Sequence, residues 1–146
     1  MTIVNEIDTL FFQQGIYWRY WDSDADPGAT WADLAFNDAA WPVGLSQFGV
    51  GEGDEQTVLN SGVASYYFRK KVNVPDVNQL SYLYLHMVHD DGAIIYINGQ
   101  ELARNEMIPL GAINHNTSAR QSSNSTNENN FYTYKVDSSY FVTGVN

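Results

Sequence analysis

The sequence of 146 residues contains no cysteine and few basic side chains. Without thiols it has no disulfide framework, no zinc–thiolate site and no cysteine nucleophile. Seven Lys and Arg residues stand against seventeen Asp and Glu residues, which gives a formal net charge of −10. Nucleic acids and anionic membranes bind clusters of cations. We therefore expect no nucleic-acid partner and no membrane partner.

Long hydrophobic runs are also absent. No apolar run approaches the roughly 20 residues that a membrane-spanning helix requires. The first residues, MTIVNEIDTLFFQQG, have no basic start, and Glu6 and Asp8 interrupt their apolar content. A secretory signal peptide has a different pattern. We expect synthesis in the cytoplasm without a signal peptide.

The sequence is rich in apolar and aromatic residues. Hydrophobic residues make up 44% of the chain and aromatic residues 14%. This composition and this length suit one domain whose core needs no metal or disulfide for support. We expect a short N-terminal arm over residues 1–9 and a single domain over residues 10–146.

The segment Leu80–Arg104 predicts the centre of the fold. Asn98-Gly99 is a strong hairpin signal, because both central residues of a type I′ turn need positive φ. An earlier turn at His89-Asp90-Asp91-Gly92 separates two apolar runs. We expect a three-stranded antiparallel meander, with both faces of residues 80–88 partly buried as in a central strand.

Other extended segments are expected on both sides of this meander, at residues 10–12, 16–21, 65–74, 131–136 and 140–142. Residues 22–54 carry few strand signals, and we interpret their Trp31, Phe36 and Trp41 as anchors that pin a long loop to the domain. Thr30 could cap a short helical turn there. The Asn- and Ser-rich residues 113–130 predict a solvated loop. The expected class is all-β, a two-layer antiparallel β-sandwich of jelly-roll type.

Several short motifs occur in the order of a known family. They are W-R-Y with Asp22 (residues 18–22), F-N-D-A-A-W (36–41), F-G-V-G (48–51), Y-F-R-K-K-V (67–72), D-D-G-A (90–93), Y-I-N-G (96–99) and Arg104-Asn105. Together they resemble a galactose-binding-like β-sandwich module, a kind appended to bacterial extracellular proteins. The resemblance covers about residues 10–146. It implies a non-catalytic module, whereas its ligand must be argued from a site.

Acidic residues in two turns are candidates for a hard cation. Asp90 and Asp91 could bind calcium through their carboxylates, but they also suit a turn in which one Asp accepts backbone N–H bonds and Gly92 supplies positive φ. We favour the turn. Asp22, Asp24 and Asp26 alternate but lack the remainder of an EF-hand pattern. We expect neither a metal nor another cofactor.

Catalytic motifs are missing from the sequence. It has no G-x-S-x-G, no H-E-x-x-H and no phosphate-binding glycine loop. His86 lies in the middle of an expected strand, and we interpret it as a hydrogen-bonded core residue. A spatial pair of carboxylates acting on a glycoside leaves no sequence signature. We expect a protein that is not an enzyme.

The first functional hypothesis is an assembly module. The apolar residues Ile3, Val4 and Ile7 of the arm and Val145 beside an unfinished C-terminal strand would contact a protein partner. The concrete form is a cement or decoration protein that docks on the major capsid protein of a phage. It would lie on the virion surface, and a homo-oligomer such as a trimer would suit it.

The second hypothesis is a carbohydrate-binding module. It rests on the family resemblance and on the aromatic content. Trp21, Trp31 and Tyr132 would stack on sugar rings, while Asp and Asn side chains would bond sugar hydroxyls. This alternative implies an extracellular location.

Overall fold

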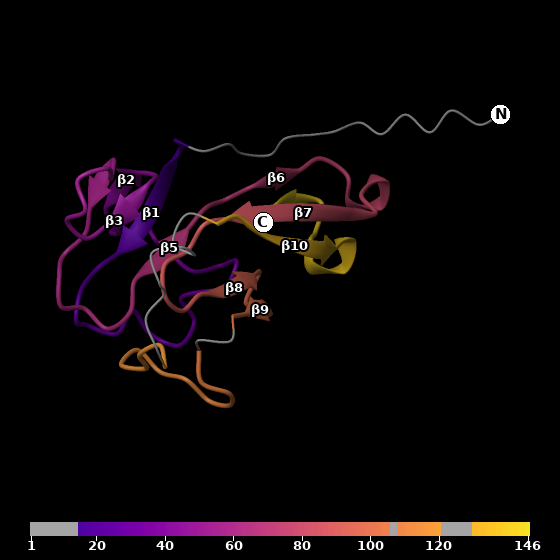
Figure 1. The fold of residues 1–146 in the computed structure, drawn as a ribbon. Helices are drawn as coiled ribbons and strands as arrows, with labels where there is room; N and C mark the ends of the chain where they lie inside the picture. Colours follow the sequence, from indigo (N-terminus) through magenta and orange to yellow (C-terminus); the bar gives the residue numbers. More distant parts are fainter. Residues whose placement is uncertain (1–14, 106–107, 121–129) are drawn as a thin grey trace.

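The computed structural model describes residues 15–105, 108–120 and 130–146 (Figure 1). Their regular structure is all-β, with short strands and two one-turn 3₁₀ helices. The expected arm over residues 1–9 and strand over residues 10–12 lie outside the described residues. The elements in chain order are β1 (Tyr17–Trp21), β2 (Val43–Leu45), β3 (Phe48–Gly49), β4 (Thr57–Val58), β5 (Tyr67–Arg69), β6 (Asn73–Val74), η1 (Val77–Gln79), β7 (Tyr82–Met87), β8 (Ile94–Ile97), β9 (Gln100–Arg104), β10 (Tyr132–Asp137), η2 (Ser138–Tyr140) and β11 (Gly144–Val145).

The first sheet has the order β2–β1–β5, and both pairings are antiparallel. Because side chains alternate along a strand, β1 has two different faces. On one face Tyr20 packs against Phe48, whose ring lies 4.8 Å from that of Phe68. On the other face Trp21 stacks on Trp41, with ring centroids 5.8 Å apart. Aromatic side chains therefore hold both faces of this sheet.

The strand expected over residues 65–74 is interrupted. It forms β5, which pairs with β1, and then β6, which pairs with β11. Residues 22–54 hold strands that the prediction missed, since β2 pairs with β1 and β3 pairs with β4 in parallel. No helix begins at Thr30; its carbonyl accepts from Asp33 N in one of several successive turns.

The predicted meander is only partly correct. The hairpin β8–β9 forms around Asn98 and Gly99, whose φ values of 51° and 83° confirm the Asn-Gly turn. The preceding strand β7 pairs with β10 instead of β8, over six residue pairs (Figure 1). The turn at residues 89–92 therefore leads the chain from one two-stranded ribbon to another.

The C-terminal residues pair with β6 and with the residue Val72 that precedes it. Asn146 exchanges two backbone hydrogen bonds with Val72, at 2.9 and 2.7 Å, which extends the β6–β11 pairing. The Asn146 side chain also bonds the backbone of Val142 and Gly144 and accepts from the side chain of Asn98. Among the described residues β11 pairs with β6 and with no other strand, so the expectation of an open edge beside the last strand stays a prediction.

The buried apolar side chains in the described residues come from several sheets: Trp41, Leu59, Val74, Ile108 and Val136. Trp41 also contacts the rings of Phe36 and Tyr67, which confirms its predicted role as an anchor of the loop. The strand pairings define five small sheets, so the two-layer jelly-roll arrangement stays a prediction.

Candidate functional site: an aromatic face on strands β7 and β10

Strand β7 is divided into an inner and an outer face. Leu83, Leu85 and Met87 are half-buried, whereas Tyr82, Tyr84 and His86 point outward and are exposed. The prediction that both faces are partly buried, as in a central strand, is therefore wrong. With β10 as its partner and one face solvated, β7 shows the alternation of an ordinary antiparallel ribbon.

Strand β10 completes the outer face. Its exposed side chains Thr133, Lys135 and Asp137 stand opposite His86, Tyr84 and Tyr82, respectively. Its inward side chains Tyr132, Tyr134 and Val136 stand opposite those that β7 buries. We call the six outward side chains of Tyr82, Tyr84, His86, Thr133, Lys135 and Asp137 the aromatic face.

Three rings form a row along β7. The centroids of Tyr82 and Tyr84 lie 5.4 Å apart, and those of Tyr84 and His86 lie 6.3 Å apart. Tyr82 is 42% exposed and Tyr84 55%. Lys135 Nζ lies 4.2 Å from the centroid of Tyr82, where the ring quadrupole attracts the ammonium group. The row thus offers apolar ring surface and polar groups side by side.

His86 is part of this face and not of the core. Its Nδ1 lies 2.8 Å from Thr133 Oγ1, a cross-strand hydrogen bond on an exposed pair. The interpretation of His86 as a core residue is wrong. The alternation Tyr-Leu-Tyr-Leu-His-Met over residues 82–87 could have shown this, because its aliphatic residues share one face.

Two of the residues predicted to bind a glycan pack inside the domain. Trp21 stacks on Trp41, and its Nε1 donates to Ala25 O at 2.7 Å. Trp31 makes edge contacts with Tyr67 at 4.8 Å and Tyr96 at 5.4 Å between centroids. Both rings are half-buried by these partners, so they anchor the loop over residues 22–54.

The third predicted residue, Tyr132, lies on the inner face of β10. Its ring stacks on His89, with centroids 4.3 Å apart. Nδ1 of His89 lies 3.3 Å from Asp91 O, and Nε2 is buried without a hydrogen-bond partner among the described residues. Burial consequently lowers the pKa of His89, because a proton on Nε2 would be desolvated.

The turn after β7 follows the predicted capping pattern with one exception. Asp90 Oδ1 accepts from Asp91 N at 2.8 Å. The positive φ belongs to Asp91, at 52°, and not to Gly92. Gly92 is required for another reason, since a Cβ there would lie 2.2 Å from Ile108 Cδ1. The turn is thus a packing feature.

The other acidic turn has a similar role. Asp22 Oδ2 accepts from Asn60 N at 2.9 Å, and Asp26 Oδ1 accepts from Gly28 N at 2.8 Å. These carboxylates fix the loops that border a pocket of about 440 Å³. Across the described ranges, no group of three His, Asp or Glu side chains is placed to hold a metal ion.

The loop expected over residues 113–130 is anchored in its first part. His115 is only 6% exposed and stacks on Tyr67. Its Nδ1 lies 3.1 Å from the Tyr67 hydroxyl and its Nε2 lies 3.0 Å from Asp24 O. The expectation of a solvated loop fails there, while residues 121–129 lie outside the described residues.

Of the four residues predicted to bind a protein partner, the structure describes only Val145. Ile3, Val4 and Ile7 lie outside the described residues. Val145 on β11 is 53% exposed. Within the ranges that the structure describes, no helix has the length and hydropathy needed to cross a bilayer.

The chain was also compared with known proteins. No family model, curated protein or solved structure matches it. Its functional assignment therefore depends on the chemistry of its own surface.

Proposed function

We propose that this chain is a non-catalytic binding module that recognises a glycan through the aromatic face. The observation that carries the proposal is the exposed row of Tyr82, Tyr84 and His86 on β7. A tyrosine combines an apolar ring with a hydroxyl group. Sugars combine apolar C–H surfaces with hydroxyl groups, so the two surfaces are complementary.

The composition of the aromatic face favours a glycan over an apolar protein surface. Each of its six side chains carries a polar group, and none is aliphatic. Thr133 and Asp137 can bond sugar hydroxyls, while the tyrosine rings cover the sugar faces. Because Trp21, Trp31 and Tyr132 pack against other rings, we propose that the sugar instead stacks on the rings of the aromatic face.

A glycan screen with the purified chain, followed by calorimetry on the best ligand, tests the proposal. We expect Tyr84→Ala to weaken binding about tenfold, because a ring contact is worth about 1.4 kcal/mol. Tyr84→Phe keeps the ring and should retain most of the affinity. Leu110→Ala is the matched control, since it removes a side chain that is 84% exposed outside the face.

Two results would count against glycan recognition by this face. One is a screen in which the wild-type chain binds no glycan. The other is an affinity that Tyr84→Ala leaves unchanged. A loss of affinity in Leu110→Ala equal to that in Tyr84→Ala would show that the effect is not specific to the face.

A second candidate function is docking on a larger particle as a phage capsid decoration protein. The end of the chain favours it, because Val145 on β11 is 53% exposed and Val142, shortly before this strand, is 48% exposed. Exposed apolar side chains beside a strand edge suit a protein partner.

Light scattering on the purified chain tests this second function. An assembly module should form an oligomer that Val145→Arg dissociates. Deletion of residues 1–9 should weaken attachment to the capsid without unfolding the domain. Genes for capsid and tail proteins beside its gene would support the proposal. A stable wild-type monomer whose gene lies outside such a cluster would overturn it.

A further inference from the structure

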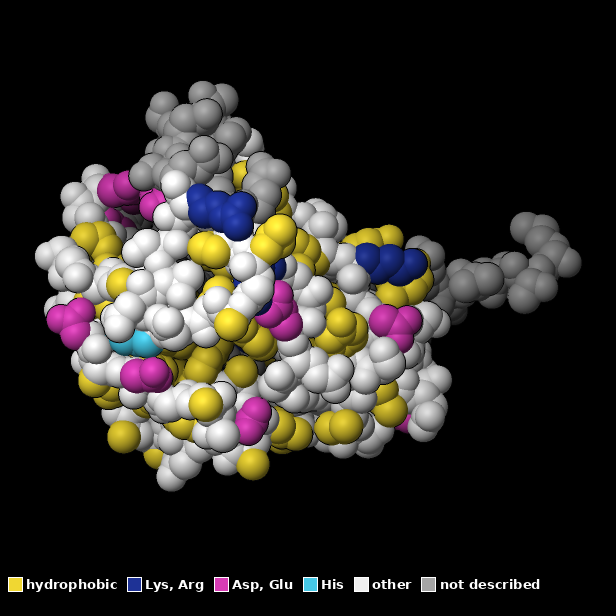
Figure 2. Space-filling model, turned by 90° about the horizontal axis from the view of Figure 1, so that it is seen from below, with side chains coloured by type: hydrophobic (Ala, Val, Ile, Leu, Met, Phe, Trp, Pro, Cys, Tyr) yellow, Lys and Arg dark blue, Asp and Glu magenta, His cyan; other side chains and the backbone are white. Residues whose placement is uncertain are grey.

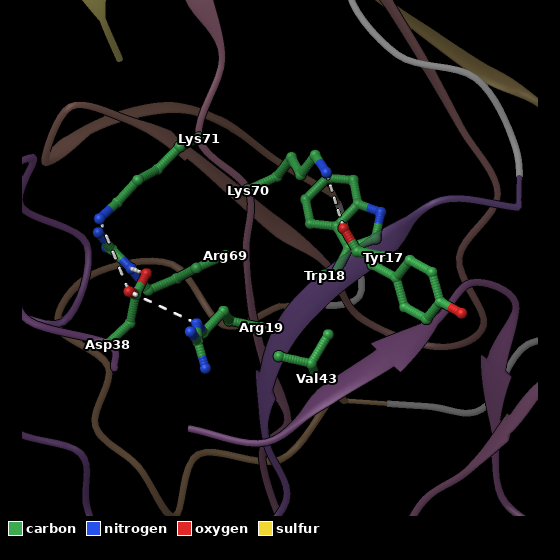
Figure 3. A pocket seen from close by; sticks show the side chains of 8 residues that line it. All are labelled: Tyr17, Trp18, Arg19, Asp38, Val43, Arg69, Lys70 and Lys71. Atoms are coloured by element: carbon green, nitrogen blue, oxygen red, sulfur yellow. Dashed lines mark hydrogen bonds and ion pairs between the residues drawn. The ribbon is translucent and has the colours of Figure 1, made fainter. Parts of the chain in front are cut away.

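A pocket of about 330 Å³ beside the first sheet collects four of the seven basic residues of the chain (Figure 3). Arg19 on β1 and Arg69 on β5 are cross-strand partners, and Lys70 and Lys71 follow on the same segment. One acidic residue, Asp38, lines the same pocket. Four cations and one carboxylate give the pocket a formal charge of +3.

Arg69 serves mainly to hold the fold together. Its Nε donates to Asp38 Oδ2 at 3.1 Å, and Asp38 is only 6% exposed. Its other nitrogens donate to the carbonyl oxygens of Trp31 and Asp33. This buried pair fastens the loop over residues 22–54 to β5, so the charge of Arg69 is already compensated.

Arg19 and Lys71 stand differently toward the same carboxylate. Arg19 Nε lies 3.8 Å and Lys71 Nζ 3.7 Å from Asp38 Oδ1, which is too far for hydrogen bonds. Their side chains are 37% and 54% exposed. Arg19 Nη1 also donates to the carbonyl oxygens of Trp41 at 2.7 Å and Ala39 at 3.3 Å. Both cations border the pocket and stay partly open to solvent, and Figure 3 shows them on two sides of Asp38.

The positive charge is local. The chain as a whole carries −10, and on the face drawn in Figure 2 the few Lys and Arg side chains lie in small groups among scattered acidic ones. A general basic surface is therefore not the basis of attraction. An anion would gain most where several cations lie close together.

The wall of the pocket adds apolar surface. Tyr17 and Val43 line it and are 63% and 53% exposed. The volume lies near the lower end of about 300–1,000 Å³ for small-molecule sites. A ligand of monosaccharide size can fill this space, with its charged group toward the cations and its body against the apolar side chains.

We propose that this pocket binds an organic anion through one carboxylate or sulfate group that contacts the exposed parts of Arg19 and Lys71 beside Asp38. The inference is independent of the glycan proposal, because β1 and β5 carry the pocket and β7 and β10 carry the aromatic face. An acidic monosaccharide is the chemical class that fits both the charge and the size.

NMR titration of the full chain with glucuronate, glucose 6-sulfate, glucose and sodium sulfate tests the proposal. Resonances of the pocket residues should shift with the two acidic sugars and not with glucose. Lys71→Gln should weaken this binding about tenfold, the effect of losing one charge-assisted hydrogen bond. Arg120→Gln, which removes the same charge from an exposed residue outside the pocket, should leave it unchanged.

The proposal is overturned if neither acidic sugar binds, if glucose binds equally well, or if Lys71→Gln binds like the wild type. Sodium sulfate binding as tightly as glucose 6-sulfate would overturn the contribution of the apolar wall. The comparison of glucuronate with glucose 6-sulfate identifies the preferred charged group. A thermal melt of Lys71→Gln checks its fold, which we expect to be intact because the side chain is 54% exposed.

Discussion

Two aromatic regions of this molecule have opposite surroundings. In the first region the rings of Trp21, Phe36 and Tyr67 each contact Trp41, a residue of the loop over residues 22–54. Along β7, Tyr82 and Tyr84 point to solvent. Similar side chains therefore stabilise the fold in one region and remain available for binding in the other. The difference lies in which sheet face a loop covers.

This comparison also explains why the tryptophans are poor guides to a ligand. A large ring near a loop covers more apolar area when it packs inside than any other side chain. The loop uses Trp31 and Trp41 for this purpose, and the ion pair between Asp38 and Arg69 fixes its position. The smaller tyrosines of β7 have no such loop over them among the described residues.

The largest effect should come from exchanging a ring in each region. Trp41→Ala should lower the free energy of unfolding by about 4 kcal/mol, because Trp41 is 5% exposed and its loss leaves a cavity. Tyr84→Ala should lower it by less than about 1 kcal/mol. Urea unfolding of both variants measures the difference, and equal losses would contradict the division into two regions.

The buried ion pair should come next. Asp38→Asn should cost about 3 kcal/mol, because it leaves Arg69 with only carbonyl partners in a site that is largely closed to water. Asp54→Asn changes an exposed carboxylate and serves as the control. If both variants unfold at the same urea concentration, Asp38 does not hold the loop on the sheet.

A smaller loss should follow from Gly92→Ala. The added methyl group would lie 2.2 Å from Ile108 Cδ1 and 3.0 Å from Ile108 Cγ1, so a buried side chain must move. Overpacking of this kind costs about 2 kcal/mol. Thermal unfolding measures this loss of stability. Gly111→Ala is the comparison, because a Cβ there meets no described atom within 4 Å and any loss comes from the positive φ of 92°. Recovery of the loss in Gly92→Ala with Ile108→Val would identify the clash as its cause.

The smallest effect should be a pH dependence from His89. Burial lowers its folded pKa below the ordinary value of 6.5, so the unfolded chain binds more protons between these two pH values. The contribution of neutral His89 to the free energy of unfolding is therefore fully present above pH 6.5. It decreases as the pH falls from 6.5 to the folded pKa. His89→Phe should remove this slope while keeping the stack on Tyr132. An unchanged slope in urea titrations would exclude His89 as its origin.

Local features were predictable from the sequence, whereas contacts distant along the chain were not. Asn98-Gly99 defines its turn because both residues can adopt positive φ without help from elsewhere. The pairing of β7 with β10 joins residues that lie 45 to 55 positions apart, as Tyr132 with Met87 and Asp137 with Tyr82. No local pattern identifies such a distant partner, so the prediction from the sequence paired β7 with its neighbour β8.

The candidate site was predictable only in part for the same reason. The alternation over residues 82–87 separates the tyrosines from the leucines, but it does not say which face another element covers. Three cations surround Asp38 only because the loop over residues 22–54 folds back onto the first sheet. They are Arg19, Arg69 and Lys71. Charges of opposite sign that lie 19 to 33 residues apart follow no spacing rule.

Asn98 has a consequence for how this sequence can vary. Besides turning the β8–β9 hairpin, its side chain donates to Tyr140 O at 3.0 Å and to Asn146 Oδ1 at 2.8 Å. Asn146 in turn holds the backbone of Val142 and Gly144. A glycine at position 98 would preserve the turn but lose this link. Positions 98 and 146 should therefore change together among related sequences, as a coupled pair of amides.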